Sequence, residues 1–223
     1  MINIAIDGPS GAGKSSLAKA LSAKLGYVYV DTGALYRSIG LYVSRKGIDP
    51  KNEQAVSAVL PEIDLEMKFE NGEQSVYLNG ENVNGKIRTP EISMYASAVS
   101  ALPPVRTFLL DLQKGIAKKE NVIMDGRDIG TVILPDAQVK IFLFADNTKR
   151  AKRRYDELLA KGEKVSLEEV LEDMTKRDNN DKNRKTAPAV QAADAVPLDN
   201  SELDLEGTVN AAIEIIRSKG IEI

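Results

Sequence analysis

The chain has 223 residues, of which 43% are hydrophobic, so it is long enough to bury a sizeable core as one domain. It has no cysteine and no histidine, which excludes disulfides, thiolate chemistry and a histidine base, so catalysis would depend on Lys, Arg, carboxylates and a metal. A net charge of −3 argues against nucleic-acid binding, and no apolar run is long enough to cross a membrane, so we expect a cytoplasmic protein.

Short apolar runs bounded by turn residues alternate with helical patterns along the chain. The predicted strands cover residues 2–6, 27–30, 121–124, 138–144 and, as a short fifth strand, about 195–198. A last helix is expected over about 204–218, because its apolar residues recur every three or four positions. This alternation is typical of an α/β domain with a parallel sheet.

A glycine-rich loop follows the first predicted strand and precedes a helical run that begins at Ser16. Its residues are Gly8, Pro9, Ser10, Gly11, Ala12, Gly13, Lys14 and Ser15. Glycines let successive N–H groups turn inward and surround phosphate oxygens at a helix N-terminus. Lys14 would reach the outer phosphates and Ser15 would bind Mg²⁺. A chance turn is the alternative, and the flanking strand and helix favour a phosphate-binding loop.

The second predicted strand leads directly into Asp31, Thr32 and, in the next helix, Tyr36 and Arg37. Open parallel sheets bind ligands at the carboxyl ends of their strands, where these side chains would join the phosphate-binding loop. Asp31 or Thr32 could simply cap the helix, with Arg37 exposed to solvent. The neighbouring loop favours Arg37 as a ligand for an acceptor phosphate.

Between residues 62 and 85 the pattern changes to alternating apolar residues. Two Asn-Gly pairs, at 71–72 and 79–80, separate extended runs, and Asn-Gly supplies the positive φ angles that tight hairpins need. We therefore predict a small three-stranded antiparallel insertion.

A helix break follows at residues 101–104, where a helix restarts at Pro103. Ser97 and Arg106 flank this break and could face one cavity, although by themselves they fit a purely structural role. The next strand ends in Asp125, and Arg127 and Asp128 follow after one glycine. A carboxylate at a strand end beside a phosphate loop often assists Mg²⁺, whereas a turn closed by an Arg–Asp pair is the alternative.

Two charged segments in the second half of the chain are ambiguous on their own. Arg150, Arg153 and Arg154 lie in a basic run that fits a solvated helix face, a nucleic-acid patch or a mobile lid over transferring phosphates. The run from Arg177 to Arg184 mixes charges at helical spacing and could be an ion-paired helix end.

A phosphate-binding loop is compatible with a small-molecule kinase, a guanine-nucleotide switch or a mechanical ATPase. The Asn-Lys-x-Asp motif of the switches is absent, and the nearest imitation, residues 175–178, lies inside a charged helical stretch. Nothing indicates the larger assembly of a mechanical ATPase. A second anion site and a lid favour the kinase.

These motifs together resemble the bacterial cytidylate kinase family across essentially the whole chain. The resemblance rests on residues 8–15, 31–37 and 125–128 and on Arg-Asp-x-x-Asp-x-x-Arg from Arg177. It implies a three-layer P-loop kinase fold with a five-stranded parallel sheet, a monophosphate-binding region at 32–102 carrying the insertion at about 62–85, and a helical lid at 148–162.

The implied reaction is phosphoryl transfer from MgATP to CMP or dCMP by a monomer. A broader UMP/CMP kinase or another small-molecule P-loop kinase is the alternative. Residues 8–16 would bind ATP, with Ser15 and Asp125 at Mg²⁺. Lys14, Arg127, Arg150 and Arg154 would be catalytic.

The resemblance also implies an acceptor site. Tyr36, Arg37 and Arg127 would hold the ribose and phosphate of CMP, and Ser97, Arg106 and Asp128 would surround cytosine. The remaining predicted substrate contacts are Thr32, Arg177, Asp181 and Arg184. Thr32 stands where relatives often have serine, and the hydroxyl is kept.

Overall fold

We describe a computed structural model of the chain that covers residues 1–70, 73–160 and 162–223. The helices are α1 (Lys14–Leu25), α2 (Thr32–Arg45), α3 (Glu53–Val59), α4 (Pro90–Val99), α5 (Pro103–Lys119), α6 (Asn147–Ala160), α7 (Leu167–Asn183) and α8 (Leu205–Ser218). The strands are β1 (Asn3–Asp7), β2 (Val28–Asp31), β3 (Leu65–Glu70), β4 (Glu73–Leu78), β5 (Glu81–Asn82), β6 (Val122–Gly126), β7 (Val139–Phe144) and β8 (Val196–Asp199).

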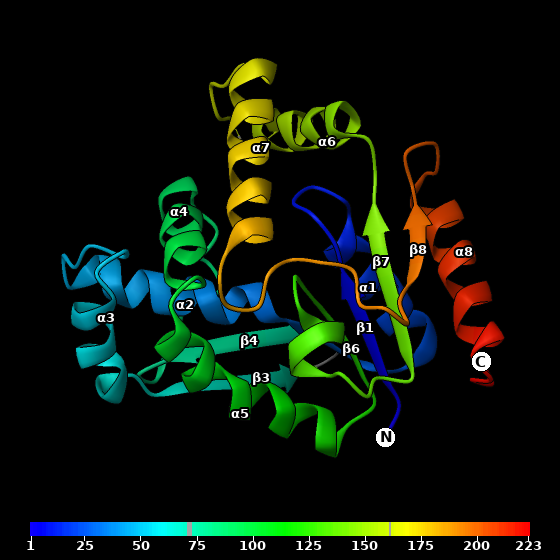
Figure 1. Cartoon of the computed structure of the whole chain (residues 1–223), viewed down its shortest axis with the longest axis horizontal. Helices are drawn as coiled ribbons and strands as arrows, with labels where there is room; N and C mark the ends of the chain where they lie inside the picture. Colours follow the sequence, from blue (N-terminus) through cyan, green and yellow to red (C-terminus); the bar gives the residue numbers. More distant parts are fainter. Residues whose placement is uncertain (71–72, 161) are drawn as a thin grey trace.

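The central sheet has five parallel strands in the order β2-β6-β1-β7-β8, which confirms the predicted fold class (Figure 1). All five predicted strands and the last predicted helix are present, with bounds that differ by one or two residues. Because β1 lies in the middle and its neighbours in the sheet come from distant parts of the chain, the strand order reverses beside it. Such a reversal is where open α/β sheets bind ligands.

Helices cover both faces of this sheet. On one face, Leu17 and Leu21 of α1 and Ile213 and Ile216 of α8 pack against buried strand residues such as Ile6. On the other face, Ala117 of α5 and a π-helical turn, Ile129–Ile133, cover residues such as Met124. The two apolar layers hold the strand ends, and therefore the loops at those ends, in fixed positions.

The second sheet, β3-β4-β5, is antiparallel, as predicted for residues 62–85. Asn79 and Gly80 have φ angles of 50° and 79°, which confirms the second predicted Asn-Gly turn. The first pair, Asn71-Gly72, lies outside the described residues. This sheet shares a core with α2, α4 and α5.

A side-chain amide joins the two sheets. Gln74 of β4 accepts a hydrogen bond from the backbone N–H of Asp31 at 2.7 Å and donates one to the carbonyl oxygen of Asp31 at 3.3 Å. The insertion is therefore seated directly on the end of β2, an outer strand of the parallel sheet.

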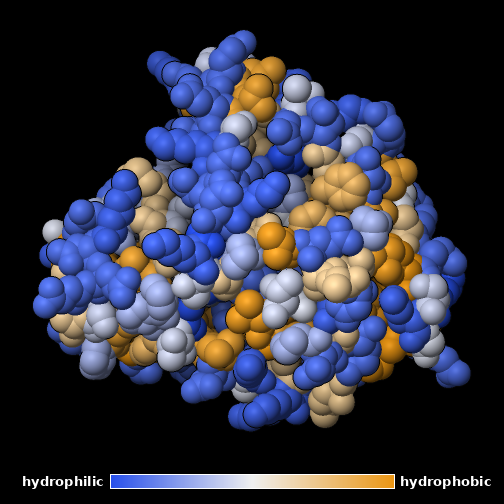
Figure 2. All heavy atoms as spheres, viewed as in Figure 1, coloured by the Kyte–Doolittle hydropathy of each residue, from blue (hydrophilic) through white to orange (hydrophobic). Residues whose placement is uncertain are grey.

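The helices α6 and α7 pack on each other through a small core of Ala151, Val170 and Met174. They form the upper part of the molecule in Figure 1, and hydrophilic side chains cover most of the visible surface of α7 in Figure 2. The predicted lid at 148–162 coincides with α6 up to Ala160, and its mobility stays a prediction. No helix in the described part of the chain is long and apolar enough to span a membrane.

Candidate active site

A cavity of about 630 Å³ opens at the carboxyl ends of β2 and β6, beside the glycine-rich loop. The predicted site residues that line it are Ser10, Gly11, Gly13, Lys14, Ser15, Ser16, Thr32, Tyr36, Arg37, Ser97, Arg106, Asp125, Arg127, Asp128, Arg154, Arg177, Asp181 and Arg184. The fold thus brings together residues from seven separate segments. Gly8, Pro9, Ala12 and Arg150 do not line this cavity in the structure.

The loop between β1 and α1 adopts backbone angles that favour glycine. Gly8, Gly11 and Gly13 have φ angles of 149°, 70° and 89°. At Gly8 a Cβ atom would also lie 1.9 Å from the carbonyl oxygen of Leu143, so only glycine fits against β7. Gly13 is the N-terminal cap of α1, and Lys14 begins that helix at the cavity wall.

Lys14 is buried and donates a hydrogen bond from Nζ to the carbonyl oxygen of Pro9 at 2.7 Å. Burial, followed by the positive charge of Arg127, lowers the pKa of Lys14 to about 7. An anion placed beside Nζ would favour the charged form. A phosphate in the cavity would therefore increase the charged fraction of Lys14.

Next to the lysine, the Ser15 hydroxyl donates a hydrogen bond to Asp125 Oδ2 at 2.7 Å. Tyr29, which the sequence did not single out, donates to Asp125 Oδ1 at 3.2 Å. Burial, followed by the charge of Asp31, raises the pKa of Asp125 to about 6. A hydroxyl and a carboxylate at this distance form a suitable oxygen pair for a hard cation such as Mg²⁺.

On the other side of the cavity, three guanidinium groups gather from α2, the β6 turn and α7. Arg37 pairs with Asp31 at 2.7 Å, and Arg127 donates from Nε to Asp181 at 3.0 Å. The Nε atoms of Arg37 and Arg177 are buried and have no hydrogen-bond partner among the described residues. Burial and then the charge of Arg127 lower the pKa of Arg177 to about 10. This group of partly buried positive charges is suited to a polyanionic ligand.

Asp128 lines the cavity and is buried. It accepts hydrogen bonds from Arg106, and from Arg184 at 3.2 Å. Arg106 also donates to the Ser100 carbonyl at 3.0 Å, and its guanidinium carbon lies 5.4 Å from the ring centre of Tyr36. Ser97 lines the same region. The predicted helix break is present, because α4 ends at Val99 and α5 begins at Pro103.

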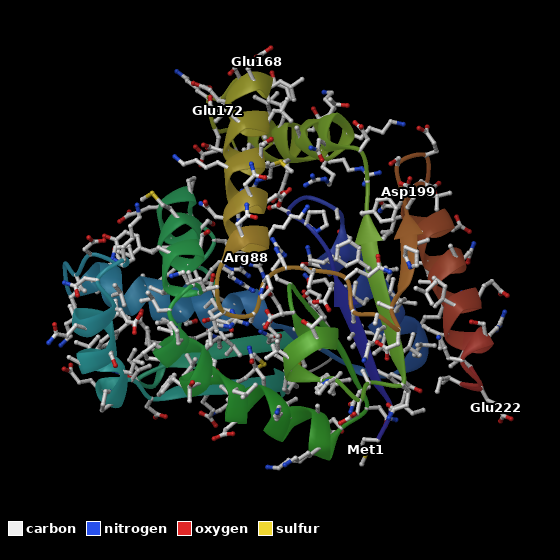
Figure 3. The ribbon with its side chains drawn as sticks, in the orientation of Figure 1. Met1, Arg88, Glu168, Glu172, Asp199 and Glu222 are labelled. Atoms are coloured by element: carbon white, nitrogen blue, oxygen red, sulfur yellow. The ribbon has the colours of Figure 1, made fainter. Side chains whose placement is uncertain are left out.

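The capping role considered for Asp31 is confirmed, but Arg37 is not exposed to solvent as that interpretation held. Asp31 caps α2 by accepting the N–H of Ala34 at 3.0 Å, and it also holds Arg37. The sequence analysis missed Arg88, which pairs with Asp31 at 3.1 Å and lines the cavity. Figure 3 shows Arg88 near the centre of the molecule, at the lower end of α7. No local motif surrounds Arg88 that could have indicated this position.

Arg150 is buried beneath the phosphate-binding loop. Its guanidinium donates to the Ser10 carbonyl and to Asp178, and its Nε donates to the Ala145 carbonyl at 3.1 Å. Asp178 in turn accepts the Ser10 N–H at 2.9 Å. The charged run of α7 is thus ion-paired, as one interpretation held: Asp178 pairs with Arg150 of α6, and Asp181 and Arg184 pair with Arg127 and Asp128 of the turn after β6. Arg154, by contrast, lines the cavity.

Arg153 and Asn200 form a second link between α6 and the loop. Arg153 donates to the side-chain and backbone oxygens of Asn200 at 3.2 and 2.7 Å. Asn200, which follows β8, donates to the carbonyl oxygen of Ala12 at 3.0 Å. The sequence analysis did not identify Asn200.

Asp7 is a buried carboxylate at the end of β1. Its two oxygens accept the backbone N–H groups of Ile129 and Gly130 at 2.8 and 2.7 Å. The sequence analysis missed it, although Asp7, Asp31 and Asp125 all stand at the ends of predicted strands and share that signal.

The comparisons with known proteins agree with this geometry. A family model described as cytidylate kinase matches residues 4–218. The cytidylate kinase of Caldicellulosiruptor bescii is 47% identical over 214 residues, which cover 96% of this chain and 95% of the relative. That of Thermosipho africanus is 48% identical over 216 residues, which cover 97% and 95%.

Solved structures support the fold alone. A shikimate kinase from Bacteroides thetaiotaomicron superposes with a TM-score of 0.50 at 15% identity, covering 97% of this chain and 98% of that chain. A gluconokinase from Sinorhizobium meliloti also gives 0.50 at 15% identity, covering 97% and 92%.

Asp7 should make stability depend on pH. Burial raises its pKa to about 6 from the ordinary value of 3.8. Between about pH 4 and 6 the folded protein keeps a proton that the unfolded chain releases, so this contribution to stability is full at lower pH and is lost as pH rises through 6. A shift of this size corresponds to a change on the order of 3 kcal/mol.

Urea unfolding of the parent and of Asp7→Asn across this pH range measures the effect. The difference between their free energies of unfolding should change with pH, because Asp125 titrates in both proteins and cancels. A difference that stays constant from pH 4 to 7 would contradict the assignment.

Proposed function

The chain belongs to the cytidylate kinase family, and from that premise we propose how its cavity transfers a phosphoryl group from ATP to CMP or dCMP. The observation that carries the proposal is the presence of two cationic regions in one cavity. One is the loop with Lys14, and the other is the group of Arg37, Arg127 and Arg177. A kinase that joins two phosphate-bearing substrates needs both.

We assign the donor half to residues 8–16. The N–H groups of the loop and the start of α1 would surround the β- and γ-phosphates of ATP, and Lys14 Nζ would move from the Pro9 carbonyl to an outer phosphate oxygen. Gly8, Pro9 and Ala12 do not line the cavity and would support the loop backbone.

Ser15 and Asp125 fit a magnesium ion that enters with ATP. Mg²⁺ commonly binds through one or two protein oxygens together with substrate phosphates. Ser15 would bind it through Oγ, and Asp125 would bind it or orient its waters. When bound, the ion would neutralise charge on the donor phosphates.

We assign the acceptor phosphate to Arg37, Arg127 and Arg177. The unpaired Nε atoms of Arg37 and Arg177 supply donors that the protein itself leaves unused. Asp31 holds Arg37, and Asp181 holds Arg127, through one edge of each guanidinium, so ligand binding requires little reorganisation of these two groups. Arg88, the exposed second partner of Asp31, could add a further donor.

Asp128, Arg106 and Ser97 are our candidates for cytosine recognition. Cytosine presents an amino donor at N4, whereas uracil has an acceptor at that position. A buried carboxylate would accept from the amine, while uracil would leave its lone pairs unpaired, and a polar site rejects such a mismatch strongly. Arg106 and Arg184 neutralise Asp128 and fix its orientation. Tyr36, Thr32, Asp181 and Arg184 would border the sugar.

The chemical step is an in-line displacement. A phosphate oxygen of CMP attacks the γ-phosphorus of ATP, the bond from that phosphorus to the β,γ-bridging oxygen breaks, and ADP departs with the electron pair. The acceptor phosphate is largely dianionic at neutral pH, so the reaction needs no histidine base. Lys14, Arg127 and Arg154 would stabilise the charge of the transferring group, and closure of α6 would exclude water.

For Arg150 we propose a role in supporting the phosphate-binding loop. Its buried contacts to Ser10 and Asp178 support a role in holding the loop under the donor phosphates. A direct contact with the transferring group would require Arg150 to leave those partners. We also propose that the protein acts as a monomer in the cytoplasm.

A coupled assay of ADP release tests the assignment of the acceptor. With MgATP, we expect turnover of CMP and dCMP to exceed that of UMP and AMP, and shikimate to be inert. Equal activity on UMP and CMP would favour a broader pyrimidine kinase, and activity on shikimate alone would contradict the proposal.

Replacing Lys14 with alanine should reduce kcat by on the order of 10²-fold or more, because a donor aimed at the transferring group is lost. Lys24→Ala, at the exposed end of the same helix, is the matched control and should leave kcat unchanged. A folded Lys14→Ala protein with near-normal turnover would rule out the assigned role.

Replacing Asp128 with alanine should reduce the preference for CMP over UMP more than it weakens ATP binding. The measurement is the ratio of kcat/KM values for CMP and UMP beside the KM for ATP. Asp136→Ala, an exposed carboxylate after the same turn, is the control. An unchanged ratio in Asp128→Ala would remove Asp128 from base recognition.

A further inference from the structure

A carboxylate outside the cavity lining holds the segment that carries the proposed base-recognition residue. Asp7 ends β1, is 4% exposed, and does not line the cavity. Its Oδ1 accepts the N–H of Ile129 at 2.8 Å, and its Oδ2 accepts the N–H of Gly130 at 2.7 Å. Both carboxylate oxygens of Asp7 thus accept hydrogen bonds from a turn that lies more than 120 residues later in the chain.

The two N–H groups belong to the first turn of the π-helical segment Ile129–Ile133. The first N–H groups of a helix have no partner within the helix, and the residue before the helix normally accepts them with its own side chain. Asp128 occupies that position here, yet its side chain makes no capping hydrogen bond. Asp7 supplies the acceptors in its place.

Because Asp7 caps this turn in place of Asp128, the Asp128 side chain is available for other contacts. The oxygens of Asp128 accept from Arg106 and Arg184 and face the cavity, which they could not do while capping their own helix. Gly130 permits the arrangement, since a Cβ atom there would lie 3.3 Å from Asp7 Oδ2 and 3.1 Å from Lys140 Cδ.

We propose that Asp7 is a positioning residue for acceptor selectivity, which acts by capping the turn at Ile129 and Gly130 so that Asp128 is available to the acceptor base. The inference rests on the proposed function of Asp128. Without the Asp7 carboxylate, Asp128 would turn to the unpaired N–H groups and withdraw from the base.

Burial of Asp7 raises its pKa to about 6, so keeping it ionised at neutral pH is unfavourable for folding. Asp7→Asn has the same shape and avoids that cost, so we expect it to fold. It presents an amide N–H₂ to one of the two N–H donors and therefore breaks one of the two capping bonds.

The experiment measures kcat/KM for CMP and UMP in the parent, Asp7→Asn, Asp128→Ala and the double variant. Asp7→Asn should lower the CMP-to-UMP ratio by about tenfold or more, because a polar mismatch is no longer penalised. The charge of Asp7 interacts with Lys14. Any effect of Asp7→Asn that acts through Lys14 would change kcat/KM for CMP and UMP equally, and it would therefore cancel in the ratio. In the Asp128→Ala background, Asp7→Asn should change the ratio no further.

Asp204→Asn is the matched control, since Asp204 caps α8 through the N–H of Gly207 far from the cavity, and it should leave the ratio unchanged. If Asp128→Ala alters the ratio and Asp7→Asn does not, the inference about Asp7 is wrong and the role of Asp128 stands. If neither variant alters it, the proposed base site fails as well. An Asp7→Asn effect that persists in the double variant would also overturn the inference.

Should Asp7→Asn fail to fold, Gly130→Ala gives the same test from the other partner. The added methyl group would press on the side chains of Asp7 and Lys140. The Lys140 side chain can shift by a few tenths of an ångström, so we expect this variant to fold. The CMP-to-UMP ratio should fall, and a normal ratio in folded Gly130→Ala protein would overturn the proposal.

Discussion

Three neighbouring parallel strands end in buried carboxylates, and the arrangement of the cavity depends on them. In sheet order these are Asp31 of β2, Asp125 of β6 and Asp7 of β1. Each orients a different group: Arg37, the Ser15 hydroxyl, and the turn that carries Asp128. Because parallel strands fix the spacing of their ends, the cavity residues on both sides are positioned by the same layer.

Such a row of acids is unfavourable by itself, and the surrounding cations compensate for it. Asp31 raises the pKa of Asp125, while Lys14 opposes that shift. Among the described residues around Arg127, the buried Nε atoms of Arg37 and Arg177 have no hydrogen-bond partner. The protein therefore presents an electrostatic environment suited to phosphate groups, and under the proposed function anionic substrates would complete the charge balance.

Local patterns predicted much of this molecule, and long-range contacts account for what they did not. The glycine-rich loop, the strands and the insertion follow from backbone preferences within a few residues, as the φ angles at Asn79 and Gly80 illustrate. Arg150 looked like a lid arginine because its basic run does not reveal that Asp178 and the Ser10 carbonyl surround it. Asp7, Arg88 and Asn200 were missed for the same reason, since their partners are distant in sequence.

The Gln74 amide has a consequence beyond the site. Asp31 is the last residue of β2, at the outer edge of the parallel sheet, and Gln74 satisfies both its N–H and its carbonyl oxygen. An open strand edge is a template on which a second chain can pair and aggregate. The insertion thus occupies the end of this strand edge, where the backbone of Asp31 would otherwise be open to pairing with another chain.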